Sequence, residues 1–277
     1  LSSVLDISMK DGNNQNYEVS GGIGVIASRL TIQGPIVKNK SSFIISARRT
    51  YVDVVAKPWI EKSDFKGTSY FFYDLNAKLN YTINDKNRLF LSGYFGRDKF
   101  VYNDAENNFG TTIPWGNSSA CFRWNHIYNS RLFANLSAVY TGYNFSFSAN
   151  QEDFTAIIKS GITDYSLKYD LSYFPNSRHS IKTGVNYTFH VFVPTNVSAK
   201  QGSTEFGLGK EIKLYSHDAA VYISDDWDLT QKLKLNMGLR FGNFTQVGPF
   251  TRYKKDSFDR IYDTITYRSN QVVCNYN

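Results

Sequence analysis

Apolar and polar side chains alternate at every second position in three separate segments of the chain. The alternation is strict in residues 73–83, which read YDLNAKLNYTI, and it returns in residues 165–173 and 233–241. A period of two places one set of side chains on each side of a β-strand, whereas a helix would scatter both sets around its circumference. The sequence therefore predicts an all-β protein whose strands have one apolar and one polar face.

Short polar clusters separate these strands and indicate an up-and-down antiparallel meander. They lie at residues 38–40, 84–87, 129–131, 175–178 and 230–232, and longer connections are expected between them at the opposite end of the sheet. We expect these longer connections at residues 53–70, 101–116, 151–156, 196–214 and from 248 onward. The predicted strands, about eleven in number, are 17–25, 26–36, 42–52, 71–83, 88–100, 117–128, 132–149, 157–174, 179–194, 215–229 and 233–247. All six prolines are expected in turns, loops or strand ends, where a missing N–H does little harm.

Strand length and composition favour a membrane-spanning β-barrel over a soluble sandwich. No stretch approaches the roughly 18 apolar residues of a transmembrane helix, and the mean hydropathy is −0.38. Sandwich strands are short, with turns every eight to twelve residues or so. Here long strands carry long connections on one side only. Aromatic residues, 16% of the chain, gather near predicted strand ends such as 70–73 and 140–143, which suits the membrane–water interface. The apolar row would then face lipid and the polar row the barrel interior.

Eleven strands cannot close a bacterial outer-membrane barrel, in which the number of strands is even. An open strand edge in lipid would leave unpaired N–H and C=O groups, each costing several kcal/mol. Either the strand number is miscounted or the chain is part of a larger barrel. The polar C-terminus, which we expect to be a truncation, favours the second.

Charge and motifs indicate neither an enzyme nor a nucleic-acid partner. The formal net charge is +7, but Lys and Arg are dispersed rather than arranged in a stripe. The four histidines form no catalytic or metal motif, Asp225, Asp226 and Asp228 lack the spacing of a calcium loop, and the Gly-rich residues 21–24 precede no helix. We expect no catalytic residue, no metal site and no cofactor. Cys121 and Cys274 are expected to be free thiols.

Several segments resemble TonB-dependent outer-membrane transporters. The opening residues 1–12 resemble the end of their plug domain, and residues 21–36 are similar to the first barrel hairpin. Residues 46–51 and 72–81 resemble the next strands, and residues 219–227 with 235–240 look like a mid-barrel pair. The nearest type is the large SusC-like transporters of Bacteroidetes, including those with a carboxypeptidase-regulatory-like domain.

The resemblance implies a 22-stranded barrel filled by a plug, with long extracellular loops and short periplasmic turns. Residues 1–12 would be the end of the plug, and residues 13–277 the first half of the barrel. It implies energised import of a ligand bound at loops and plug, powered through a TonB-type periplasmic partner that binds a region absent from this sequence. It also allows a surface lipoprotein partner. The alternative is a non-transporting outer-membrane barrel that acts as an adhesin or as part of a surface complex.

Two groups of residues are candidates for binding. Trp59 and Trp115 are expected in loops beside Pro58 and Pro114, where an aromatic ring can hold a sugar or peptide ligand. Arg252, Lys254 and Lys255 are expected at a loop end, where they would meet lipopolysaccharide phosphates in an outer membrane. Packing within the loop and simple solvation are the alternatives for the two groups.

Overall fold

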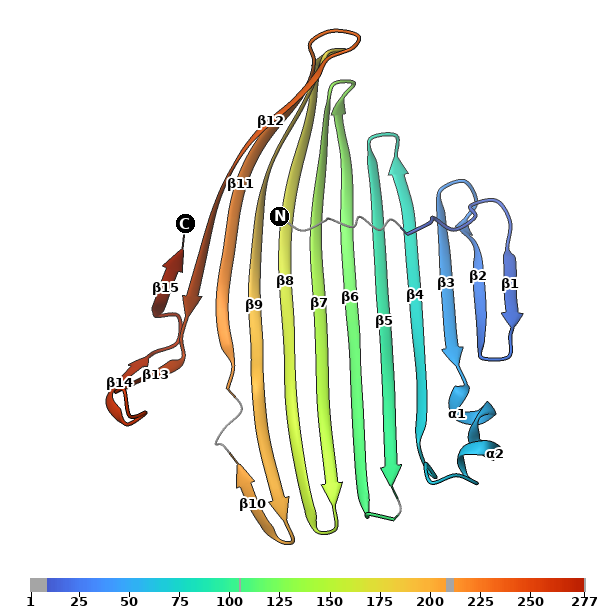
Figure 1. The fold of residues 1–277 in the computed structure, drawn as a ribbon. Helices are drawn as coiled ribbons and strands as arrows, with labels where there is room; N and C mark the ends of the chain where they lie inside the picture. Colours follow the sequence, from blue (N-terminus) through green and yellow to red (C-terminus); the bar gives the residue numbers. More distant parts are fainter. Residues whose placement is uncertain (1–8, 105, 208–211, 277) are drawn as a thin grey trace.

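The computed structural model describes residues 9–104, 106–207 and 212–276 and consists almost entirely of long antiparallel strands (Figure 1). Two short helices, α1 (Val52–Val55) and α2 (Lys57–Ile60), lie between β3 and β4. The strands are β1 (Glu18–Ile23), β2 (Ala27–Val37), β3 (Ser41–Thr50), β4 (Ser69–Asn84), β5 (Asn87–Asp104), β6 (Phe109–Asn129), β7 (Leu132–Gln151), β8 (Phe154–Asn176), β9 (His179–Gln201), β10 (Thr204–Gly207), β11 (Leu214–Asp228), β12 (Lys234–Val247), β13 (Phe250–Lys255), β14 (Ile261–Tyr267) and β15 (Val272–Tyr276).

Sequence order and spatial order agree almost throughout the main sheet. Thirteen strands form one antiparallel sheet in the order β1 to β9, then β11, β12 and β15, with β10 paired to β9. β13 and β14 form a separate two-stranded sheet. All eleven predicted strands are present, and the all-β antiparallel meander is confirmed. The expected strand number was too low because β10, β13, β14 and β15 are short and lie inside segments expected to be loops.

The connections β2–β3, β4–β5, β6–β7, β8–β9 and β11–β12 lie at one end of the sheet, here called the turn end, and α1, α2 and β10 lie at the other, the loop end (Figure 1). Two predicted long connections are much shorter than expected. β5 runs on to Asp104 and β6 begins at Phe109, while only two residues separate β7 from β8. One of those two, Glu152, has a φ of 49°, which allows a tight hairpin.

Two prolines lie inside strands rather than at their ends, contrary to expectation. Pro114 pairs in register with Lys99 of β5, but the β6–β7 register passes from Thr112 to Trp115 without it. Pro194 is likewise skipped where the β8–β9 register passes from Lys159 to Gly161. A residue without an N–H is tolerated in a strand at such an interruption of the ladder.

The register aligns side chains in rows across strands β4 to β9 and so defines two faces of the sheet. One row is apolar and consists of Leu79, Leu91, Phe122, Ala138, Leu167 and Tyr187, which are successive partners from β4 to β9. The row beside it consists of Lys78, Ser92, Cys121, Val139, Ser166 and Thr188. We call the side of Leu79 the apolar face and the side of Lys78 the polar face.

Neither face is covered as it would be in a soluble domain. Among the described residues, the buried apolar side chains are only Pro35, Ala134, Ala220 and Val247. The accessible surface is 19103 Å², against about 12,000 Å² for a compact monomer of this mass. Leu167 and Val221 of the apolar face are 51% and 50% exposed. The described helices include none long and apolar enough to cross a membrane.

Candidate functional site

Three aromatic side chains meet on the polar face near the loop end. Tyr70 and Phe72 lie in β4 and Trp115 in β6, and their positions in the register place all three on the side of Lys78. The Tyr70 ring lies 6.3 Å from Trp115, with 24° between the ring planes, and 6.3 Å from Phe72. We call these three residues the aromatic cluster. Half-buried rings at such distances form a platform on which a flat ligand can stack.

Charged groups border the aromatic cluster on one side. The Arg48 guanidinium lies 5.0 Å from the centre of the Phe72 ring and donates to Asp74 at 2.7 Å. The Tyr70 hydroxyl donates to Asp98 at 3.0 Å. These bonds fix the ring of Tyr70 and hold a cation over Phe72. The site therefore offers flat apolar area together with donors and acceptors.

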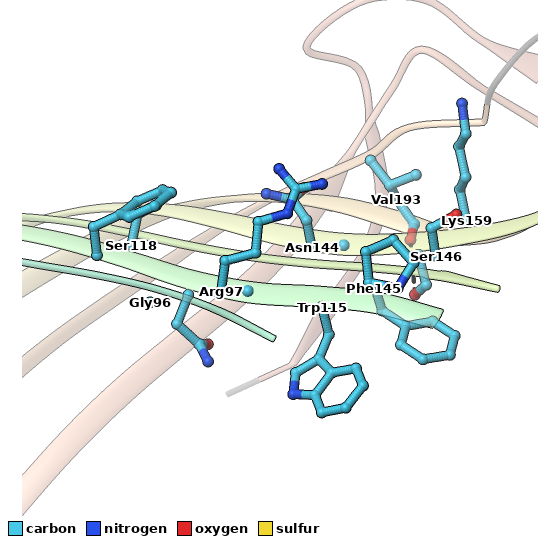
Figure 2. Close-up of a pocket in the computed structure, with 15 residues that line it drawn as sticks. Gly96, Arg97, Trp115, Ser118, Asn144, Phe145, Ser146, Lys159 and Val193 are labelled. Carbon is cyan, nitrogen blue, oxygen red and sulfur yellow. Dashed lines mark hydrogen bonds between the residues drawn. The ribbon is translucent and has the colours of Figure 1, made fainter. Parts of the chain in front are cut away.

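The structure places the two predicted tryptophans differently. Trp115 belongs to β6 and not to a loop, because the strand extends through Pro114 to Phe109. Figure 2 shows its indole ring on the opposite side of the strands from Arg97 and Lys159. Trp59 lies in α2, is 71% exposed, and is not among the residues of the aromatic cluster. A sequence signal for this position exists. Trp115, Asn117 and Ser119 occupy every second position, so they share the polar face of a strand that continues to Trp115.

The aromatic residues expected at the membrane interface divide between the two faces. Phe71, Tyr73 and Tyr140 lie on the apolar face, but Tyr70, Phe72 and Tyr143 lie on the polar face. Only the first group therefore lies on the face expected to meet lipid, because adjacent residues of a strand point to opposite sides.

The three basic residues assigned to lipid contact lie on β13 of the separate hairpin. Lys254 bonds to Asp263 at 2.9 Å, and Lys255 bonds to Asp259 at 3.0 Å. The hydrogen bond to Asp263 raises the pKa of Lys254, and Lys254 lowers the pKa of Asp263 in return. Two of these charges are thus already compensated by carboxylates. A lipopolysaccharide contact through Arg252, Lys254 and Lys255 stays a prediction.

Each of the carboxylates that were weighed as calcium ligands bonds to a neighbouring histidine or lysine side chain. Asp225 bonds to His179 at 2.6 Å, Asp226 to Lys182 at 3.5 Å, and Asp228 to Lys234 at 3.0 Å. No group of three or more metal-ligating side chains occurs in the described parts of the chain. Cys121 and Cys274 are free thiols, as expected.

Residues 9–12, the described part of the predicted plug end, lie against the polar face of β3 and β4, and residues 1–8 lie outside the described residues. The Lys78 ammonium bonds to the Asp11 carboxylate at 2.6 Å and to the carbonyl oxygen of Met9 at 2.7 Å. The Ser42 hydroxyl donates to the carbonyl oxygen of Gly12 at 2.8 Å. A Cβ at Gly12 would stand only 2.1 Å from the carbonyl oxygen of Phe43, so the close approach requires glycine.

Comparisons with known proteins identify the fold. No protein-family model and no curated protein matches the sequence. Among solved structures, the copper transporter OprC matches with a TM-score of 0.65 and 9% identity over 95% of this chain and 42% of that one. The ferric-catecholate import receptor Fiu from E. coli K12 gives 0.59 and 10%, over 96% and 51%.

BauA, the ferric preacinetobactin receptor from Acinetobacter baumannii, gives a TM-score of 0.58 and 9% identity over 80% of this chain and 39% of that one. The chain thus spans about half or less of the length of each matched structure. Its sheet has the fold of roughly half of a TonB-dependent outer-membrane receptor barrel.

Proposed function

We propose that the chain is the plug end (residues 1–12) and first barrel half (residues 13–277) of a TonB-dependent outer-membrane transporter. The observation that carries this is a long antiparallel sheet with one uncovered apolar face and the fold of half such a barrel. Lipid is the medium in which that face is stable, and a wet interior is the medium for the other.

The dimensions of the apolar face support a membrane span. On β8 the outward positions from Tyr165 to Tyr173 are aromatic or leucine. Eight steps of ~3.4 Å make ~27 Å along the strand, or ~21 Å of height for strands tilted by about 40°. The apolar band of outer-membrane barrels is about 25 Å tall. The rings of Tyr140 and Tyr165 lie 5.5 Å apart at the edge of this outward row that is nearer the loop end, and Tyr128 bonds to Tyr169 at 3.3 Å nearer the turn end.

The polar face supports a transporter with a filled interior. The bonds from Lys78 to Met9 and Asp11 tie the segment before β1 to that face, as the end of a plug would be tied. The aromatic cluster suits an organic ligand that carries rings. Within the family we favour the SusC-like Bacteroidetes type, with a TonB-type periplasmic partner and a surface lipoprotein, because the sequence as a whole resembles that type most.

Uptake by cells that make the full-length protein tests the proposal. The matched proteins are receptors for ferric siderophores or a copper transporter, so the first probe is a ferric catecholate labelled with radioactive iron. We expect accumulation that disappears when the energy-coupling partner is deleted and falls in a Trp115→Ala variant. Accumulation that is unchanged without the partner would contradict energised import. Surface binding without any accumulation would favour the adhesin or structural barrel.

A further inference from the structure

A hollow of about 330 Å³ opens on the apolar face near the loop end, across strands β5 to β9. Gly116 and Gly161 have no side chains to fill it, and both belong to one row that also contains Arg97 and Asn144. Lys159 stands one outward position nearer the loop end on β8. Figure 2 shows Arg97, Asn144 and Lys159 projecting from the same side of the strands, with Trp115 on the other. We call this feature the basic hollow.

The cations of the basic hollow lack carboxylate partners. In the described part of the chain, no ion pair involves Arg97 or Lys159, which line the hollow, or Lys99, which lies one outward position beyond Arg97 on β5. Their apolar-face neighbours in register are Phe71, Tyr73, Pro114, Gly116, Asn144, Ser146, Gly161 and Asn196. None of these is acidic. The nearest carboxylates along the strands, Asp98 and Asp164, are on the polar face, and Asp164 bonds to His190.

The position of the basic hollow relative to the apolar band indicates what fills it. The next outward positions toward the turn end include Phe95, and then Tyr140 and Tyr165. Phe95 lies 6.0 Å from Tyr73. Farther toward the turn end, the same face has a second hollow of about 380 Å³, lined mainly by apolar side chains such as Leu167, Val185 and Phe241. Cations thus stand directly beyond an aromatic belt and an apolar surface, which matches the order of headgroup and acyl chains in a lipid.

We propose that the basic hollow binds the phosphorylated headgroup of an outer-leaflet glycolipid of the lipopolysaccharide class. The Arg97 guanidinium presents a planar fork of N–H donors to phosphate oxygens, while Lys159 and Lys99 supply point charges and Asn144 a neutral amide. The acyl chains lie along the apolar face. The site rests on the proposed membrane-barrel function and is separate from Arg252, Lys254 and Lys255 of the β13–β14 hairpin.

Binding of purified lipopolysaccharide to the full-length protein in detergent solution tests the site. The probes are the lipid, the same lipid with its phosphates removed, and inorganic phosphate as competitor. We expect the affinity for the phosphorylated lipid to be at least about tenfold higher than that for the dephosphorylated lipid, because only the first forms charge-assisted hydrogen bonds with the cations. The Arg97→Gln/Lys159→Gln variant should lose most of that difference, and Arg97→Lys/Lys159→Arg should keep it within about threefold.

The matched control is Arg88→Gln/Arg123→Gln, which removes the same charge from the polar face of β5 and β6. It should leave binding unchanged, and circular dichroism should show equal strand content in all variants. Unchanged lipid binding in Arg97→Gln/Lys159→Gln would overturn the proposal, as would equal binding of the dephosphorylated lipid. Full displacement by micromolar inorganic phosphate would also overturn it, because the site would then bind a free anion. A protein that does not enter detergent micelles at all would contradict the barrel itself.

Discussion

An arginine placed on each face of β8 in turn should separate a membrane barrel from any water-soluble fold. Leu167 points out from the apolar face and is 51% exposed, and Ser166 beside it points to the polar face. An arginine on the lipid face of such a barrel costs about 2–4 kcal/mol at the bilayer midplane and less toward the interfaces. Leu167 lies two residues from Tyr169, the middle of the outward row between Tyr165 and Tyr173. We therefore expect Leu167→Arg to lower the free energy of unfolding by about 2–3 kcal/mol.

Ser166→Arg introduces the same side chain into the polar interior. It breaks the 2.9 Å hydrogen bond between the hydroxyls of Ser166 and Thr188, which contributes about 1 kcal/mol. Urea titration of the protein refolded into phospholipid vesicles measures both changes. The expected difference between the two variants is at least about 1 kcal/mol, with Leu167→Arg the less stable. Equal costs, or a larger cost for Ser166→Arg, would refute the assignment of the two faces.

Three further outcomes are expected. Trp115→Ala should weaken ligand binding by about 1 kcal/mol or more through loss of ring stacking, whereas Trp59→Ala should leave binding unchanged; the reverse order in a binding titration would exclude the aromatic cluster as the site. Lys78→Met should raise amide hydrogen exchange in residues 9–16 while the strands stay protected, because the variant loses the bonds to Asp11 and Met9; unchanged exchange would mean that these bonds do not hold the segment. The pKa of Asp263 is lowered by Lys254, so its stabilisation of the β13–β14 hairpin is present above the unfolded carboxyl pKa and lost as the pH falls through the lower folded value. Proteolysis of residues 248–271 should rise in acid, and this pH dependence should be absent in Asp263→Asn.

The strand pattern was readable from the sequence because each face of the sheet meets a different medium. In residues 75–81 the apolar side chains Leu75, Leu79 and Tyr81 alternate with polar ones such as Lys78 and Asn80. A β-strand is the only regular structure that places these two sets on opposite faces. This alternation placed all eleven predicted strands. Strand ends were harder to predict. β5 and β6 continue past the apolar band into polar sequence such as Asn103 and Thr111, where the two faces no longer differ in polarity and the alternation disappears.

The candidate site was only half readable. Trp115 was named from the sequence as a binding candidate, but it was expected in a loop, and its neighbours Tyr70 and Phe72 come from a strand some forty residues earlier. Only the register brings the three together. The basic hollow depends even more on register. Arg97, Asn144 and Lys159 are ordinary polar residues in the sequence. Nothing in the local sequence shows that Gly116 and Gly161 leave space between their side chains. Only the pairing register of β5 to β8 shows that the three side chains lie on the same face.

The pairing register of the long strands also limits where insertions and deletions can occur in the chain. Deleting one codon of β8 before Leu167 would move every later side chain of that strand to the opposite face, so that Leu167 and Tyr169 would exchange sides with Lys168 and Asp170. Insertions and deletions should therefore accumulate in the residues between β3 and β4 and in the β13–β14 hairpin, because neither segment pairs with the strands of the main sheet. Related sequences should differ in length there and keep the spacing of the long strands.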